Sequence, residues 1–227
     1  AVQVRKAMNI AIDRQTLVDE LLSGFGRTQS VRDWMGHDHR QNPEWEYEYN
    51  PELAKQMLED AGYGDGFEIT LTPAIRGAPA EVESCHAVAN YWEKIGISVK
   101  IQNLPYATIR PELITRKYNG ITCLTVSSRL SPIIGASNYT TDSTYSYGTH
   151  HPWLDEHIWD TQKQVDQSKI EAGELEIYNF IWENSMAASL YVHDGLWPAG
   201  PRVDPVWEPT DFSDMKAPSG FEYVKHR

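Results

Sequence analysis

Apolar residues repeat along the chain in two rhythms, which predict alternating helices and strands. A spacing of three to four residues, typical of a helix with one buried face, marks segments 4–12, 17–22, 53–61 and 82–92. Strict alternation with polar residues, typical of a half-buried strand, marks residues 67–71 and 97–101. This order of strand, helix and strand predicts a parallel pair joined by a right-handed crossover.

The later segments extend this pattern. A second crossover over residues 106–118, interrupted by Pro111, leads to an apolar strand at 121–126. Two long helices are expected after His151-Pro152, and a short strand at 189–192. We therefore predict an α/β fold with a mostly parallel sheet flanked by helices.

Two stretches lack this periodicity. Residues 27–49 are polar and aromatic, and we expect a long surface loop there. Residues 127–151 are rich in Ser, Thr, Asn, Tyr and Gly, and we expect a polar loop that is either ordered or disordered. Asp13 and Asn50, each just before a helical pattern, are expected to cap helices.

Charge and composition exclude several classes of function. The chain has 227 residues and a net charge of −12, so its surface repels phosphate backbones and we expect no nucleic-acid partner. No apolar run approaches the roughly 20 residues that a membrane-spanning helix needs.

Cys85 and Cys123 both lie in apolar segments without CxxC spacing. We expect two buried thiols rather than a disulfide.

Polar and aromatic residues follow the three predicted parallel strands. In such a sheet ligands bind outside the carboxyl ends of the strands, where the connecting loops meet. The candidate ligand-binding residues in these loops are Arg76, Tyr106, Ser127, Ser128, Arg129, Asn138 and Tyr139. The two arginines and the hydroxyl and amide groups donate hydrogen bonds that suit a carboxylate or phosphate. The alternative is that these are ordinary solvated loop residues.

The sequence offers little for catalysis or metal binding. The histidines at 37, 39, 150, 151 and 157 lie near carboxylates, but no pair has helical spacing with a catalytic Glu. No G-x-S-x-G elbow and no glycine-rich phosphate loop is present. The carboxylates of Glu171, Glu174 and Glu176 are expected on solvated helix faces. We expect no catalytic site, no metal and no cofactor.

Four segments resemble, in order and spacing, a lobe of the peptide/nickel class of ABC-importer binding proteins, solute-binding family 5. They are VRKAMNIAIDRQTLVDELLSG at 4–24, NPELAKQMLEDAGYGDGFEITL at 50–71, ANYWEKIGISVKIQ at 89–102 and EIYNFIWENSMAASLYVHDGLW at 176–197. The resemblance implies a periplasmic-binding-protein-like type II architecture, in which two lobes close on a small ligand. Residues 1–194 would be the C-terminal, ligand-binding lobe, and residues 195–227 a tail that crosses back to a missing N-terminal lobe.

The resemblance also implies partners and a location. The partners would be a peptide-like, sugar-like or anionic solute, an ABC permease and the missing lobe, with self-association of the fragment through its unpartnered tail. The location would be periplasmic or otherwise extracytoplasmic, free or lipid-anchored. Helical periodicity begins almost at Ala1 without an apolar leader, so we expect the upstream part to be missing.

One departure from the family bears on the ligand. Members that bind a free peptide amino terminus carry an Asp four residues before a Pro; here Pro132 matches and the earlier position is Ser128. With Arg129 beside it, this loop is expected to favour an anionic or neutral group over an ammonium. Two other functions remain open from sequence: a ligand-sensing domain of a regulator, and a hydrolase on the same fold.

Overall fold

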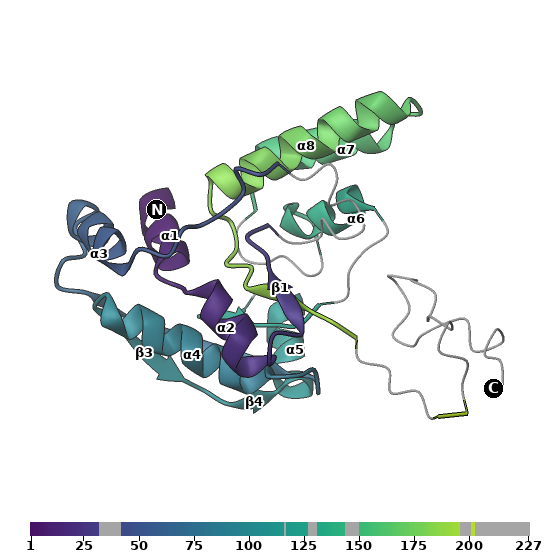
Figure 1. Ribbon diagram of the computed structural model, residues 1–227. Helices are drawn as coiled ribbons and strands as arrows, with labels where there is room; N and C mark the ends of the chain where they lie inside the picture. The colour runs from purple at the N-terminus through teal and green to yellow at the C-terminus, as the bar shows by residue number, and fades with distance from the viewer. Residues whose placement is uncertain (32–41, 116, 127–130, 144–149, 196–200, 203–227) are drawn as a thin grey trace.

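The chain folds into helices packed around a small parallel sheet, with a helical hairpin at one end (Figure 1). The computed structural model describes residues 1–31, 42–115, 117–126, 131–143, 150–195 and 201–202. The predicted α/β class with a mostly parallel sheet is confirmed. Within the described ranges, no helix has both the length and the apolar character needed to span a bilayer.

Strand β2 (Phe67–Ile75) is the centre of the sheet. It pairs in parallel with β3 (Ile97–Ile101), β4 (Leu104–Pro105) and β5 (Ile121–Cys123). Leu71 is in register with both Ile101 and Ile121, so β2 lies between β3 and β5. The predicted parallel pairing is confirmed, although β2 is longer and β5 shorter than the sequence pattern indicates.

Helices from two parts of the chain cover the sheet. The crossover helix α4 (Glu81–Lys94) packs on β2 and β3 and buries Cys85, Ala89 and Trp92, as its periodicity predicts. The second crossover, α5 (Tyr106–Ile114), contains Pro111. The N-terminal helices are α1 (Val2–Ile10), α2 (Arg14–Leu21) and α3 (Pro51–Asp60). The side chains of Asp13 and Asn50 accept backbone N–H groups at the starts of α2 and α3, so both predicted caps are confirmed.

A buried arginine joins the N-terminal helices to the chain that leaves the helical hairpin. Arg14 is only 5% exposed; its Nε donates to the Ser189 carbonyl at 2.8 Å and its Nη2 to Asn9 Oδ1 at 2.7 Å. Burial lowers the pKa of Arg14 to about 10, so the guanidinium remains charged near neutral pH. Arg5 similarly donates to the Asn184 carbonyl at 2.8 Å. The polar residues of the first family-like segment therefore hold distant parts of the chain together.

A second core lies under the helical hairpin of α7 (Pro152–Gln162) and α8 (Gln167–Glu183). The short helices α6 (Pro132–Ala136) and η2 (Ser137–Tyr139) contribute Ile133 and Tyr139 to it. The expectation of a loop over 127–151 is therefore wrong for residues 132–139, which form these two helices. Apolar positions too few to show a period pack here against helices that are distant in sequence.

The expectation of an irregular surface loop over 27–49 is partly wrong: described residues 42–49 form no helix or strand, but residues 27–28 lie in a strand and two aromatic rings are buried. Gly26–Thr28 form β1, which pairs antiparallel with β6 (Tyr191–His193). Trp45 is fully buried, and its indole N–H donates to Asn179 Oδ1 at 2.8 Å. Tyr47 is 9% exposed and its hydroxyl lies 3.1 Å from Ser185 Oγ. These rings are core residues that tie the segment to α8.

Three side chains differ from the predicted helix faces. Leu53 and Leu175 recur at helical spacing with other apolar residues, which favours burial, yet they are 49% and 38% exposed. Glu174, assigned to a solvated face, is 2% exposed, and one of its carboxylate oxygens lies 3.3 Å from the Ile133 backbone nitrogen. The helical period places residues on a face but does not show which neighbour covers that face.

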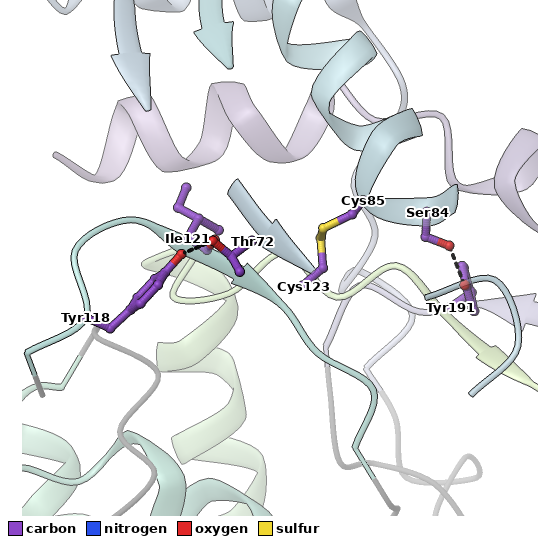
Figure 2. The surroundings of a disulfide bond; sticks show 7 residues. All are labelled: Thr72, Ser84, Cys85, Tyr118, Ile121, Cys123 and Tyr191. Carbon is purple, nitrogen blue, oxygen red and sulfur yellow. Dashed lines mark hydrogen bonds between the residues drawn. A yellow bond between two sulfur atoms is a disulfide. The ribbon is translucent and has the colours of Figure 1, made fainter. Parts of the chain in front are cut away.

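Cys85 and Cys123 form a disulfide, so the expectation of two separate thiols is wrong (Figure 2). The bond joins the second turn of α4 to the end of β5 across Cα atoms 5.8 Å apart. The two cysteines meet because β5 pairs directly with β2, the strand that leads into α4. That adjacency depends on strand order, which cysteine spacing does not reveal.

We predict that the disulfide stabilises the fold substantially. It closes a loop with a sequence separation of 38 residues, for which the chain-entropy relation gives about 4 kcal/mol. Denaturant unfolding with and without dithiothreitol should show a loss of that order on reduction. The double variant Cys85→Ala/Cys123→Ala should be insensitive to dithiothreitol. An unchanged midpoint for the reduced parent would show that the bond contributes no stability.

A second prediction concerns the entry into β2. Gly66 has φ +74°, and a Cβ added there would collide with the backbone carbonyl oxygen of Gly96, the residue before β3. Gly62 has a similar φ of +84° but open space around it. Gly62→Ala should cost about 1–2 kcal/mol for the left-handed backbone alone. Gly66→Ala should cost a further 1–3 kcal/mol or so for the steric overlap. Equal unfolding free energies for the two variants would contradict this close packing.

Candidate functional site

The carboxyl ends of three strands meet at one edge of the sheet. Ile75 at the end of β2 is in register with Pro105 of β4, and Pro73 is in register with Cys123 of β5. The segments that follow these strands therefore begin side by side. This edge is where the sequence predicts a ligand site.

Arg76 reaches across this edge. Its Nη1 donates to the Thr125 carbonyl oxygen at 3.0 Å, which links the end of β2 to the segment after β5. Its guanidinium carbon lies 4.8 Å from the ring centroid of Tyr106, the first residue of α5. Two predicted site residues, Arg76 and Tyr106, are thus brought together, and Arg76 remains exposed.

The loop that carries Arg76 is organised by one carboxylate. Glu81 Oε2 accepts hydrogen bonds from the backbone N–H groups of Arg76 and Gly77, both at 2.7 Å, and of Ala78 at 3.0 Å. Gly77 has φ +92° and Ala80 has φ +56°, so the loop turns through two left-handed residues before α4 begins. Three consecutive N–H groups directed at one anion form a backbone nest.

The disulfide and hydrogen bonds between uncharged hydroxyls lie in the part of the fold that carries this edge (Figure 2). The Tyr118 hydroxyl lies 2.7 Å from Thr72 Oγ1, and Thr72 is fully buried in β2. Burial raises the pKa of Tyr118, so its phenol is uncharged near neutral pH. The Ser84 hydroxyl, next to Cys85 in α4, lies 2.5 Å from the Tyr191 hydroxyl of β6. Arg76 is therefore anchored to a cross-linked part of the fold.

The remaining predicted residues are placed differently. Tyr139 is 2% exposed in the second core, where its ring packs against protein. Asn138 is half-buried and donates to the Gly135 carbonyl at 2.9 Å. The predicted site residues Ser127, Ser128 and Arg129 lie outside the described residues, as does most of the predicted tail over 195–227.

The side chains at this edge could bind an anion. The edge presents an exposed guanidinium beside an aromatic ring. In the described part of the chain, no three His, Cys, Asp or Glu side chains converge as metal ligands would. A shallow surface groove lined in part by His157, Lys169 and Glu176 lies between α7 and α8, away from this edge.

Sequence reasoning missed three contributors to this edge. The Thr125 carbonyl is a backbone group, for which side-chain identity gives no signal. Glu81 is recognisable in principle as an acidic residue at the first position of a helix after a Gly- and Pro-containing turn. The Cys85–Cys123 bond becomes evident only once β5 is known to pair with β2.

Comparison with known proteins places this geometry in a family. Residues 1–148 match the profile of the bacterial extracellular solute-binding proteins, family 5 Middle. Heme-binding protein A of Haemophilus influenzae is 27% identical over 221 residues, which cover 89% of this chain and 38% of that protein. Oligopeptide-binding protein AppA of Bacillus subtilis is 31% identical over 123 residues, 47% of this chain and 22% of that protein.

Solved structures agree on the fold. HbpA2 from Haemophilus parasuis superimposes with a TM-score of 0.73 at 19% identity, covering 85% of this chain and 39% of that chain. A dipeptide binding protein from Pseudoalteromonas sp. SM9913 in complex with Met-Leu gives 0.72 at 18% identity, with the same coverages of 85% and 39%. The chain therefore spans about two fifths of these longer relatives. The family comprises solute-binding proteins, which confirms the expectation that the chain is not an enzyme. This chain belongs to family 5 of the bacterial extracellular solute-binding proteins.

Proposed function

We propose that this chain is one ligand-binding lobe of a binding protein that captures a small solute and delivers it to an ABC importer. The observation that carries the proposal is the position of Arg76, exposed beside Tyr106 at the carboxyl edge of the parallel sheet. Ligands of open α/β sheets bind at this edge because loops from several strands meet there. Family membership supports the same role.

The chemistry of the edge favours a carboxylate-bearing ligand. A guanidinium offers paired donors that match a carboxylate, and an adjacent ring offers an apolar surface. The relatives include proteins named for binding heme, di- and tripeptides, and glutathione. All of these ligands carry carboxylates. Ser128 and Arg129, which the sequence predicts as site residues, favour a ligand group that is anionic or neutral over an ammonium. A sugar-like solute is the alternative to a carboxylate-bearing one.

The architecture we propose has two lobes that close on the ligand. Residues 1–194 form one lobe, and residues 195–227 cross back to the other. The exposure of Arg76 supports this arrangement, because a small-molecule site normally encloses most of its ligand and a second lobe would supply that cover. Besides the solute and the second lobe, we propose that this protein binds the permease of the importer.

The disulfide supports a location outside the cytoplasm. Cys85 and Cys123 are bonded, and such bonds persist in oxidising compartments but are rare in the cytosol of most bacteria. One structural relative is a periplasmic murein tripeptide binding protein. We therefore propose a periplasmic or other extracytoplasmic location, which favours transport over a cytoplasmic regulator.

The role of Arg76 predicts a selective loss of affinity. In the intact protein, Arg76→Ala should weaken binding of carboxylate ligands by roughly 10- to 100-fold, the equivalent of one charge-assisted contact. Calorimetry with hemin, reduced glutathione and the dipeptide Met-Leu tests this. Lys94→Ala is the matched control: its ammonium also lies over a ring, 5.0 Å from the centroid of Tyr91, but in the last turn of α4.

Lys94→Ala should leave affinity unchanged. The proposed anchor is wrong if Arg76→Ala binds as tightly as the parent, or if none of the three ligands binds to the intact protein.

The two-lobe architecture predicts that the 227-residue chain binds any of these ligands far more weakly than the intact protein. Closure of a second lobe supplies about half of the contacts and excludes water. Calorimetry of both proteins with the same ligand measures the difference. Equal affinities would show that the site is complete within this chain.

A further inference from the structure

Glu81 does more at this edge than begin a helix. We propose that Glu81 is a positioning residue for ligand binding: its carboxylate fixes the backbone of residues 76–78 and thereby holds the Arg76 guanidinium where a ligand anion meets it. This inference rests on the proposed role of Arg76. Neither the sequence pattern nor the family match assigns a role to Glu81.

The contacts of Glu81 show that it acts on the loop. Its Oε2 accepts three backbone hydrogen bonds, from Arg76 and Gly77 at 2.7 Å and from Ala78 at 3.0 Å. Its Oε1 is buried and has no hydrogen-bond partner among the described residues. Because Oε2 is occupied by the three loop amides and Oε1 is buried, the carboxylate faces the protein rather than solvent. A ligand therefore meets Arg76 rather than Glu81.

The loop needs this anion because its conformation is unfavourable by itself. Ala80 adopts a left-handed φ of +56°, which is uncommon for a residue with a side chain. Three N–H groups directed at one point, together with the N-terminus of α4, also concentrate positive potential there. The negative charge of Glu81 neutralises that potential and makes each hydrogen bond charge-assisted.

The same contacts reach Arg76 directly. The Arg76 amide is held by Glu81, while its guanidinium is held by the Thr125 carbonyl at 3.0 Å and the Tyr106 ring at 4.8 Å. Both the backbone and the guanidinium of Arg76 are therefore held in place before a ligand arrives. Fixing a side chain in advance lowers the entropic cost of binding.

Glu83 provides a matched control. It lies in the same first turn of α4, carries the same charge and is exposed. The three loop amides donate to Glu81 and not to Glu83. Glu83→Ala changes the net charge and removes an acidic residue from the first turn of α4, as Glu81→Ala does. Unlike Glu81→Ala, it leaves the hydrogen bonds to the loop in place.

The first test needs no ligand. In the 227-residue chain, Glu81→Ala should speed hydrogen exchange of the amides of residues 76–78 and speed modification of Arg76 by phenylglyoxal, read by mass spectrometry. Glu81→Gln, which keeps one acceptor oxygen and the side-chain shape, should lie between Glu81→Ala and the parent. Glu83→Ala should match the parent. Unchanged exchange and modification in Glu81→Ala overturn the inference; if Glu81→Ala does not fold, Glu81→Gln carries the same comparison.

The second test measures binding of hemin, reduced glutathione and Met-Leu to the intact protein. Glu81→Ala should weaken binding about three- to tenfold, the range expected when one side chain must be ordered by the ligand. In an Arg76→Ala background it should have no further effect on affinity, although any effect on stability would persist. Full additivity of the two substitutions, or no effect of Glu81→Ala where Arg76→Ala weakens binding, refutes this inference alone. No effect of Arg76→Ala refutes the proposed anchor itself.

Discussion

Strand β2 pairs in parallel with β3 on one side and with β5 on the other, and the geometry of the candidate site follows from that pairing. Parallel strands all end at the same edge, so the segments after β2, β4 and β5 begin side by side. Arg76 contacts both Tyr106 and Thr125 directly, although Thr125 is 49 residues away in sequence. The same pairing brings Cys85 to Cys123.

Around that edge, covalent and electrostatic contacts act on the same short segments. The disulfide joins α4 to β5, the Arg76–Thr125 hydrogen bond joins the preceding loop to the residues after β5, and Glu81 connects the loop to α4. Farther away, Arg14 and Trp45 bind the N-terminal segments to α8 and the chain beyond it. The edge that carries Arg76 is thus attached to a cross-linked part of the fold, which suits the ligand-binding role that we propose for it.

Much of the fold could be predicted from local signals. The periods of β2, β3 and α4, and the caps at Asp13 and Asn50, are carried by neighbouring residues, so sequence alone located them. Strand ends are also predictable from local pattern, so sequence placed Arg76 and Tyr106 after two strands, and the structure brings the two side chains into contact. The burial of Trp45 and Glu174 and the disulfide were missed, since each depends on which distant element packs against it. Thr125 contributes only a carbonyl, which no residue pattern marks.

We propose that the carboxyl edge of this sheet binds the anionic group of a solute through Arg76. A crystal structure of the intact protein with a bound carboxylate ligand tests it most directly. We expect the ligand carboxylate about 3 Å from the Arg76 guanidinium nitrogens, over the Tyr106 ring, with Glu81 still bound to the amides of residues 76–78. A ligand whose carboxylate lies elsewhere, with Arg76 turned to solvent, would contradict it.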